Sequence, residues 1–259
     1  MVSRLRRIRG TAKVIITVGA MQLNYQLLIC DLDGTLLNGE EIAIQCLAGT
    51  LARFQLPEPE GALVAELCRV HYIVRSSELW SRLAGSCTEK VVQACIQHYD
   101  LSCRELLHTR PPLFPHVHEV IRAVKNAGVQ LVVLSNRDQA DLTAALGACD
   151  LNPYVDLAVG VGGRVQPKPD LSALHLAIRP VFGRIPPDGM LVCGDSSTDL
   201  GFARAAALSC CWATYGYGDA NECAVFQPEF TIGDIRELLG VLDGSSFRER
   251  NRWPFRGHA

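Results

Sequence analysis

Two kinds of apolar pattern alternate along the chain from Met21 onward. Short apolar runs predict buried strands, and the stretches between them repeat apolar residues at the spacing of a helix. The expected strands span residues 26–30, 129–134, 157–160, 190–193 and 209–213, with a shorter one at 229–232. Helices are expected at 118–127, 138–146, 170–178, 198–207 and 234–242. Strands that alternate with helices in this way predict βα units around a parallel sheet.

The alternation stops between residues 38 and 112. Apolar residues there recur only at helical spacing, in the segments 40–54, 61–83 and 88–99. We therefore predict an α/β protein with a Rossmann-like, three-layer core around a parallel sheet, formed by residues 21–37 and 113–243. An all-helical domain, residues 38–112, is expected to be inserted after the first strand and to sit above the sheet.

The two ends of the chain differ from this core. Residues 1–20 contain five basic residues and no acidic one, and their apolar stretch is shorter than a secretory signal requires. The composition alone leaves an organellar transit peptide open. We expect a disordered extension, or a start assigned too far upstream, with the folded protein beginning near Met21. The polar, Arg-rich residues 244–259 are expected to form a loose tail.

Composition narrows the possible classes of protein. Of 259 residues, 48% are hydrophobic and 20% are charged, with a net charge of -2. This balance argues against a protein that binds nucleic acid or a membrane, and no apolar run is long enough to span a bilayer. The eleven cysteines form no C-x-x-C motif and mostly lie in apolar runs. We interpret them as reduced thiols in the core of a cytoplasmic protein.

Charged residues directly follow several of the expected strands. Asp31 and Asp33 come after the first strand, where unpaired carboxylates would be costly to bury. Asp195 and Asp199 follow a later strand, and Lys168 lies in a loop between two prolines. Because the carboxyl ends of parallel strands meet at one edge of a sheet, these side chains are expected to lie together. The set suits Mg²⁺, which prefers oxygen ligands, together with a phosphate group.

Other kinds of site fit the sequence less well. An EF-hand that starts at Asp31 would need Gly and Glu where Leu36 and Ile42 stand. The glycines at 160–163 lack the spacing of a dinucleotide-binding loop, and no P-loop motif occurs. His116 and His118 have no evident third metal ligand, so we expect a surface pair near a helix start.

Four motifs occur in order at the ends of expected strands. They are D-L-D-G-T-L at 31–36, L-S-N at 134–136, K-P at 168–169 and G-D-S-x-x-D at 194–199. With a helical insert after the first motif, the sequence resembles the phosphoglycolate phosphatase-like group of the haloacid dehalogenase superfamily. The resemblance extends over residues 22–242 and includes W-A-T-Y-G-Y-G at 212–218.

This resemblance implies roles for the residues of the first motif. Asp31 would attack phosphorus to form an aspartyl-phosphate, and Asp33 would act first as general acid and then as general base. Mg²⁺ would be held by the Asp31 carboxylate, the Asp33 backbone carbonyl and Asp195. Gly34 would let the backbone approach the phosphate closely, with Thr35 beside it in the substrate-binding loop.

The later motifs would complete the site. Ser135 and Lys168 would bind the phosphoryl oxygens, with Asn136 beside them, and Lys168 would also offset the charge of Asp31. Asp199 would orient Lys168 or a water on the metal, although a carboxylate favoured in the first turn of a helix is an equally good interpretation. Outside the set of motifs, Ser135 would be interpreted as a turn residue.

The implied function is Mg²⁺-dependent hydrolysis of a small phosphorylated metabolite, a phosphoglycolate-like ester or a sugar phosphate, by a monomer or homodimer. Asp33 argues against a dehalogenase, which needs no acid for a leaving alkoxide. A sugar phosphomutase of the same superfamily remains an alternative. A non-catalytic binding module is disfavoured because Asp31, Asp33, Lys168 and Asp195 are all present.

The helical insert corresponds to a cap domain, which is expected to select the substrate. It contains Arg69, Arg75 and Trp80 in one segment. An arginine there could bind a carboxylate or a second phosphate of the substrate, although a solvated charge on a helix surface is the more common case. Lys90, the one lysine of the insert, lies at an expected helix start, which disfavours a phosphonate hydrolase.

Overall fold

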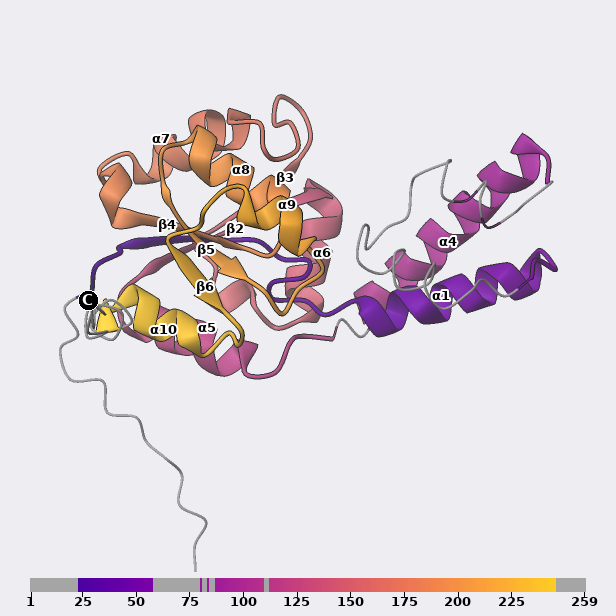
Figure 1. Ribbon diagram of the computed structural model, residues 1–259, viewed down its shortest axis with the longest axis horizontal. Coiled ribbons are helices and arrows are strands. Elements are labelled where there is room, and N and C mark those ends of the chain that lie inside the picture. The colour runs from indigo at the N-terminus through magenta and orange to yellow at the C-terminus, as the bar shows by residue number, and fades with distance from the viewer. Residues whose placement is uncertain (1–22, 58–79, 81–82, 84–86, 110–111, 246–259) are drawn as a thin grey trace, which may run out of the picture.

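Six parallel strands form the centre of the molecule (Figure 1). The computed structural model describes residues 23–57, 80, 83, 87–109 and 112–245. The order of the strands is β3-β2-β1-β4-β5-β6, so the first strand of the sequence lies between β2 and β4. The strands are β1 (Leu27–Cys30), β2 (Gln130–Asp138), β3 (Leu157–Val161), β4 (Met190–Gly194), β5 (Ser209–Ala213) and β6 (Phe230–Ile232).

Both faces of the sheet are buried, which explains why its strands are apolar throughout. In β1, Leu28 and Cys30 belong to one buried cluster, and Leu27 and Ile29 belong to another. The first cluster includes residues of α5 (Val117–Asn126), α6 (Gln139–Ala148) and α10 (Glu237–Leu242). The second includes residues of a π-helical segment (Leu174–Ile178), α7 (Arg179–Phe182) and α8 (Ser197–Ala205). Helices on both faces of the sheet confirm the predicted three-layer core.

The expected strands are all present, and the clearest difference is the length of β2. This strand runs to Asp138 instead of ending at residue 134, and its pairing with β3 shifts register between Leu134 and Asp138. The Asp138 side chain then caps α6 by accepting a hydrogen bond from the Asp141 N–H at 2.8 Å. The polar residues after the apolar run are therefore still part of the sheet.

The remaining short elements are α9 (Ala220–Ala224) and two 3-10 turns, Asn152–Tyr154 and Pro187–Gly189. The helix expected at 170–178 is π-helical from Leu174 to Ile178 and continues as α7 to Phe182. The helix expected at 234–242 begins at Glu237.

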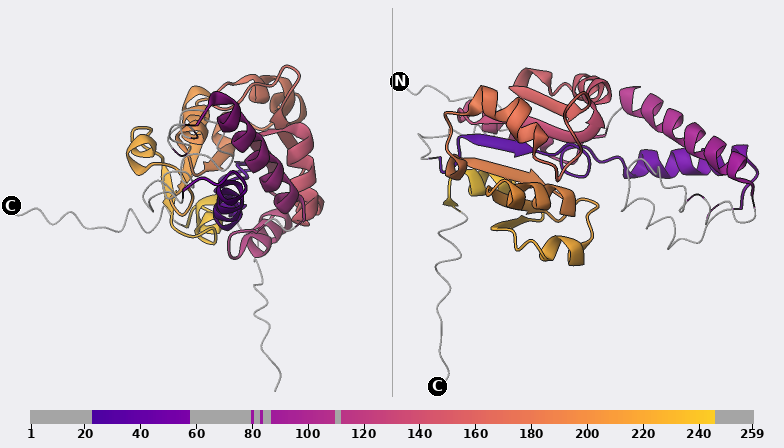
Figure 2. Two further views of the ribbon diagram at one scale, coloured as in Figure 1. Left: turned by 90° about the vertical axis from the view of Figure 1, so that its right-hand side faces the viewer. Right: turned by 90° about the horizontal axis from the view of Figure 1, so that it is seen from above.

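Two helices of the expected cap extend away from the edge of the sheet where the strands end (Figures 1 and 2). α1 (Glu40–Arg53) and α4 (Glu89–Thr109) pack side by side. α4 continues well past its expected end at residue 99, because Cys95, Tyr99 and Cys103 continue a buried stripe at a spacing of four residues. Most of the helix expected at 61–83 lies outside the described residues.

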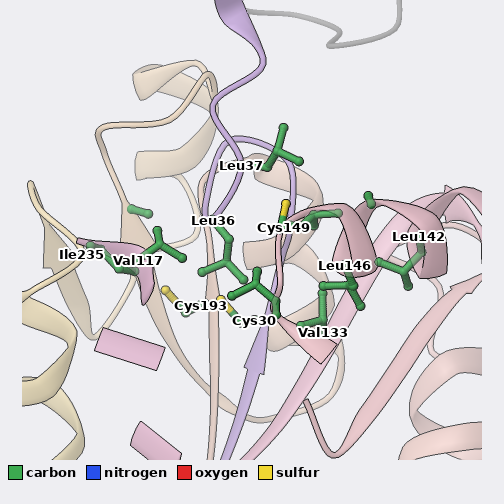
Figure 3. Packing of buried hydrophobic residues seen from close by; sticks show 14 of the residues in the cluster. Cys30, Leu36, Leu37, Val117, Val133, Leu142, Leu146, Cys149, Cys193 and Ile235 are labelled. Atoms are coloured by element: carbon green, nitrogen blue, oxygen red, sulfur yellow. The ribbon is translucent and has the colours of Figure 1, made fainter. Parts of the chain in front are cut away.

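Cysteines contribute to the packing of the core. Cys30 and Cys193 pair in register on β1 and β4, and both lie close to Leu36 (Figure 3). The ten described cysteines are free thiols, and nine of them are buried. This agrees with their interpretation as small apolar core residues. Within the described ranges, the helices are too short or too polar to cross a membrane.

Candidate active site

The first motif forms a tight loop at the end of β1. The Asp31 N–H donates to the Cys193 carbonyl at 2.8 Å, so the backbone at Asp31 continues the hydrogen bonding between β1 and β4. The N–H groups of Leu36 and Leu37 then both donate to the Leu32 carbonyl, at 2.9 and 2.8 Å. The side chains of all three leucines are fully buried. The apolar residues of the motif thus anchor the loop that presents its carboxylates.

Gly34 and Thr35 pack against Asp195. Gly34 has a φ of +84°, and a Cβ atom at this position would lie 2.3 Å from Oδ2 of Asp195. Any side chain would therefore be both strained and in collision with the carboxylate. The Thr35 hydroxyl lies 3.5 Å from Oδ1 of Asp195. The contact of Gly34 and Thr35 with phosphate stays a prediction.

Three buried carboxylates converge at this edge of the sheet. Asp31 follows β1, Asp195 follows β4, and Asp199 lies in the first turn of α8. One oxygen of each lies within 4.8 Å of the other two. Across residues 23–57, 80, 83, 87–109 and 112–245, this is the one group of carboxylate, histidine or cysteine side chains with metal-binding spacing.

Lys168 links two of these carboxylates. Its Nζ atom donates to Oδ1 of Asp31 at 2.5 Å, to Oδ1 of Asp199 at 2.6 Å and to the Leu134 carbonyl at 2.9 Å. A lysine ammonium has three protons to donate, so each has a protein acceptor here. Lys168 therefore lies against the expected nucleophile, and contact with a phosphoryl oxygen would require exchange of one of these bonds.

Asp199 serves both as a helix cap and as a partner of Lys168. Its Oδ2 atom accepts hydrogen bonds from the Ser196 N–H at 3.1 Å and from the Ser196 hydroxyl at 2.6 Å, which completes a capping box at the start of α8. Its other oxygen accepts from Lys168. The two interpretations of Asp199 are thus compatible, because the cap fixes the carboxylate that contacts the ammonium.

The second motif shapes the surroundings of Lys168. Oδ1 of Asn136 accepts a hydrogen bond from the Lys168 N–H at 2.7 Å, and Nδ2 of Asn136 lies 3.4 Å from the Lys168 carbonyl. The buried Ser135 hydroxyl accepts from the Arg137 N–H at 3.1 Å, and its own proton can still be donated. Asn136 thus positions the Lys168 loop, and its contact with substrate stays a prediction.

Arg137 belongs to the site although no motif points to it. Its Nε atom donates to Oδ2 of Asp33 at 2.7 Å, and its Nη2 atom donates to Oδ1 of Asp33 at 2.6 Å. The two residues are 104 positions apart in the sequence. The available signal was a basic residue directly after Ser135 and Asn136, and sequence alone cannot pair it with a carboxylate in the loop after another strand.

The segment W-A-T-Y-G-Y-G encloses Asp195. The Tyr217 N–H donates to Oδ2 of Asp195 at 2.7 Å, and the Trp212 indole N–H donates to the Asp195 carbonyl at 2.9 Å. The Tyr215 hydroxyl donates to the Thr35 carbonyl at 2.9 Å. This segment therefore connects the loop after β4 with the first motif, a role that the resemblance alone does not reveal.

Burial changes the ionisation of the central groups. It raises the pKa of Asp195 to about 7, and the nearby charge of Asp199 adds to the effect. Burial also raises the pKa of Asp31, although Lys168 opposes this. Burial would lower the pKa of Lys168, but the charges of Asp199 and Asp31 outweigh it and raise that pKa. The Lys168 ammonium therefore stays charged. The carboxylates of Asp31, Asp195 and Asp199 repel one another when they are ionised.

The charges of the site leave room for a divalent cation. The carboxylates of Asp33 and of the three clustered aspartates supply four negative charges, and Lys168 and Arg137 supply two positive ones. With every carboxylate ionised, two negative charges would remain in a buried place, where uncompensated charge is costly, and burial accordingly raises the pKa of Asp195 in the metal-free protein. Oxygen donors, their close approach and this residual charge all fit a hard ion such as Mg²⁺.

Comparison with known proteins agrees with this geometry. A profile of haloacid dehalogenase-like hydrolases matches residues 28–213, which include the four motifs at the strand ends. The chain belongs to the haloacid dehalogenase-like hydrolase family. Phosphoglycolate phosphatase 1 of Pseudomonas aeruginosa is 28% identical over 229 residues, or 84% of this chain and 80% of the relative. The phosphoglycolate phosphatase of Haemophilus influenzae is 26% identical over 226 residues, or 86% of this chain and 100% of the relative.

Solved structures share the fold of this haloacid dehalogenase-like hydrolase. A structure described as a predicted phosphoglycolate phosphatase from Haemophilus somnus has a TM-score of 0.69 and 22% identity, and covers 85% of this chain and 99% of its own. A structure described as a haloacid dehalogenase superfamily hydrolase from Geobacter sulfurreducens has a TM-score of 0.67 and 18% identity. The match covers 87% of this chain and 100% of that one. The structural likeness establishes the fold. The family profile identifies the chain as a haloacid dehalogenase-like hydrolase, and its sequence relatives include proteins named phosphoglycolate phosphatase.

Several residues named from the sequence lie away from this family's site. His116 and His118 are both exposed at the start of α5, as expected, and His116 has the left-handed φ of +67°. Trp80 is fully buried inside the cap, where its ring packs edge-on against Tyr99 at 5.6 Å between centroids. Lys90 is exposed at the start of α4. The cap arginines at positions 69 and 75 lie outside the described residues.

Proposed function

We propose that this hydrolase is a Mg²⁺-dependent phosphatase that hydrolyses a small phosphate monoester through an aspartyl-phosphate on Asp31. The observation that supports this most strongly is the position of Asp31, whose carboxylate lies beside Asp195 and Asp199 and 2.5 Å from the Lys168 ammonium. A buried carboxylate held in one orientation by a fixed cation is well suited to act as a nucleophile.

In the first half of the reaction, an oxygen of Asp31 attacks phosphorus. The new P–O bond forms while the bond to the leaving group breaks, and the electron pair goes to the leaving oxygen. Asp33 donates a proton to that oxygen, so that an alcohol departs instead of an alkoxide. The position of Asp33 two residues after Asp31, on the same loop, supports this division of roles.

In the second half, water attacks the phosphorus of the aspartyl-phosphate. The Asp33 carboxylate accepts the proton of the water, the bond between phosphorus and Asp31 breaks, and its electron pair returns to the Asp31 carboxylate. The products are an alcohol and inorganic phosphate, and both aspartates return to their starting forms. One residue thus serves as acid and then as base.

Mg²⁺ would be held by the carboxylates of Asp31 and Asp195 and by the Asp33 backbone carbonyl. When bound, the ion offsets the repulsion between carboxylate and phosphate and orients the two groups. Lys168 keeps the Asp31 carboxylate in place, and Asp199 acts through Lys168. Ser135 would donate its hydroxyl proton to a phosphoryl oxygen.

The relatives support a small anionic substrate such as phosphoglycolate. Proteins named phosphoglycolate phosphatase align with more than four fifths of this chain at 26 and 28% identity. The helices α1 and α4 belong to the expected cap, which would contact the part of the substrate beyond phosphate. The free, mostly buried thiols support work in a reducing compartment such as the cytoplasm.

Metal dependence tests this proposal directly. Phosphate release should be measured from an aryl phosphate and from a panel of small phosphate monoesters, first with Mg²⁺ and then with a chelator. We expect release with Mg²⁺, none with the chelator, and recovery when excess Mg²⁺ is added back. Full activity in the chelator would contradict the metal assignment. Release without an added bisphosphate activator would separate a phosphatase from a phosphomutase.

A further inference from the structure

Tyr217 contacts the core through its backbone and the expected cap through its side chain. Its N–H donates to Oδ2 of Asp195 at 2.7 Å. Its hydroxyl donates to Oδ1 of Asn38 at 2.9 Å and accepts a hydrogen bond from the Gly39 N–H at 2.6 Å. Asn38 and Gly39 form the linker between the first motif and α1, the first helix of the expected cap (Figure 1). One residue thus joins a proposed metal ligand to the place where the cap begins.

The backbone around Tyr217 has little room to move independently of Asp195. A Cβ atom at Gly216 would lie 2.3 Å from the Cβ atom of Asp195, and one at Gly218 would lie 2.1 Å from the Asp195 carbonyl oxygen. The two glycines therefore let the backbone on either side of Tyr217 pack directly on Asp195. The Trp212 indole N–H also donates to the Asp195 carbonyl at 2.9 Å. Because close packing transmits displacements, a shift of Asp195 should carry Tyr217 with it.

The start of α1 depends on the hydroxyl of Tyr217. Gly39 is the N-cap residue and offers no side chain to cap the helix. Its backbone is buried, and its N–H has the Tyr217 hydroxyl as acceptor. A buried N–H that loses its acceptor is destabilised. Removal of this one hydroxyl should therefore loosen the end of α1 that lies next to the core.

The segment that returns from the cap passes the same tyrosine. The Asn38 N–H donates to the Pro112 carbonyl at 2.7 Å, which joins the outgoing and returning segments. The Phe114 ring lies 6.3 Å from the Tyr217 ring between centroids. A residue in contact with both connections is well placed to set the position of the cap.

The Tyr217 hydroxyl is engaged by the linker and not directed at a substrate. A tyrosine hydroxyl has one proton, and here that proton goes to Asn38 while the oxygen accepts from Gly39. Burial raises the pKa of Tyr217, so the group stays a neutral phenol. Its role is therefore to hold the linker, and proton transfer to the substrate is left to other groups.

We infer that Tyr217 is a positioning residue that couples the cap linker to Asp195, so that a cation held at Asp195 also fixes the start of the cap. This inference rests on the metal site proposed above. In the metal-free protein, the clustered carboxylates repel Asp195 when they are ionised. A bound cation offsets this repulsion and holds Asp195 in one position. Tyr217 then passes the restraint to the linker through its hydroxyl.

Amide hydrogen exchange, read at single residues by NMR with Mg²⁺ as the only ligand, tests this coupling. The amide at position 217 reports on Asp195, and the amide of Gly39 reports on the linker. In the wild type, we expect Mg²⁺ to slow exchange at both positions. Tyr217→Phe keeps the ring and the backbone N–H. In this variant Gly39 should exchange about ten- to a hundredfold faster, as for a buried N–H without an acceptor.

The decisive comparison is the effect of Mg²⁺ in the two proteins. In Tyr217→Phe, Mg²⁺ should still protect the amide at position 217 but should lose most of its effect on Gly39. Tyr154→Phe is the matched control, because it removes a tyrosine hydroxyl from the core turn Asn152–Tyr154. This control should behave as the wild type does.

Steady-state kinetics separate positioning from chemistry. With Mg²⁺ and 4-nitrophenyl phosphate, Tyr217→Phe should raise KM about two- to tenfold and change kcat less than about twofold. The reason is that the placement of the cap is altered while the reacting groups are not. A fall in kcat at unchanged KM would contradict a positioning role. If the wild type hydrolyses no ester, the proposed function is refuted, and the exchange data still decide the coupling.

The other outcomes of the exchange experiment also decide. Equal protection of Gly39 by Mg²⁺ in the wild type and Tyr217→Phe would overturn the inference, because the ion would then act through the first motif alone. Protection of position 217 without protection of Gly39 in the wild type would overturn it as well. Mg²⁺ that protects neither amide refutes the proposed metal site and the coupling together. If Tyr217→Phe does not fold, Asn38→Ala should weaken the protection of Gly39, and unchanged protection refutes the coupling.

Discussion

Lys168 and Arg104 each bridge two aspartates, but in different surroundings. Lys168 contacts Asp31 at 2.5 Å and Asp199 at 2.6 Å, and its side chain is 4% exposed. Arg104 on α4 lies 3.2 Å from Asp141 and 3.7 Å from Asp138, and its side chain is 36% exposed. The first group lies at the ends of the central strands. The second joins a helix of the expected cap to the start of α6.

This difference shows how burial decides the consequence of an ion pair. Removal of one partner from a buried pair leaves an uncompensated charge, whereas pairs near the surface contribute little because water replaces the lost partner. The arrangement around Lys168 is therefore fixed before a substrate arrives. At the second group water can reach the Arg104 guanidinium, although the Asp141 side chain is 11% exposed, so we expect this contact to open at a lower cost than that of Lys168.

Removing the Lys168 ammonium should have the largest effect. We expect Lys168→Gln to lower kcat/KM by about 10²–10³. The free energy of unfolding of the metal-free protein should fall by roughly 3–5 kcal/mol, because Asp31 and Asp199 lose their shared cation. Phosphate release and urea unfolding measure the two effects. When Asp199→Asn is combined with Lys168→Gln, part of the stability should return, and losses that simply add would disprove the coupling.

The raised pKa of Asp195 predicts competition between protons and Mg²⁺. Burial raises this pKa from its ordinary value of 3.8 to about 7, so the folded, metal-free protein binds a proton more tightly than the unfolded chain does. The stability of the metal-free protein should therefore fall as pH rises from about 4 to about 7. Mg²⁺ should bind more weakly below pH 7 than above it.

Thermal unfolding with and without Mg²⁺, on both sides of pH 7, measures this competition. We expect Mg²⁺ to raise Tm more on the alkaline side, because Asp195 is then a free carboxylate. The variant Asp195→Asn should reduce the dependence, and Asp31, a second proposed ligand whose pKa burial also raises, should account for what remains. A Mg²⁺ effect on Tm that is the same at all pH values would argue against Asp195 as a ligand.

Arg104→Gln should have the smallest effect. Because the Arg104 side chain is 36% exposed, we expect a loss of about 1 kcal/mol in the free energy of unfolding, well below that of Lys168→Gln, and the loss should shrink as salt is added. Hydrolysis of a small aryl phosphate should change little. Urea unfolding at low and high ionic strength provides the measurement. A loss comparable to that of Lys168→Gln would remove the distinction between the two regions.

The sequence predicted the core well because its strands are buried on both faces. Such strands appear as continuous apolar runs, and each motif carboxylate stands where a run ends, as Asp31 and Asp195 do. The convergence of Asp31, Asp195 and Asp199 then follows from the parallel arrangement of the strands. The polar end of β2 was missed, because its residues pair with β3 without an apolar pattern.

Contacts between distant segments could not be predicted in the same way. Arg137 meets Asp33 across 104 residues, and Tyr217 meets Asp195 through a backbone N–H that any residue except proline could supply. Neither contact leaves a local pattern in the sequence. The length of α4 was underestimated for a different reason, since Asp100 and Arg104 interrupt the apolar pattern while Cys103 continues its buried face.

Trapping the covalent intermediate tests the central role of Asp31 most directly. The enzyme should be mixed with a phosphate monoester and Mg²⁺, quenched in acid during turnover, digested and analysed by mass spectrometry, with Asp31→Asn treated in parallel. We predict one phosphoryl group on the peptide that contains Asp31, lost in the variant and lost when a chelator replaces Mg²⁺. A phosphoryl group on another peptide, or normal turnover by Asp31→Asn, would contradict the account.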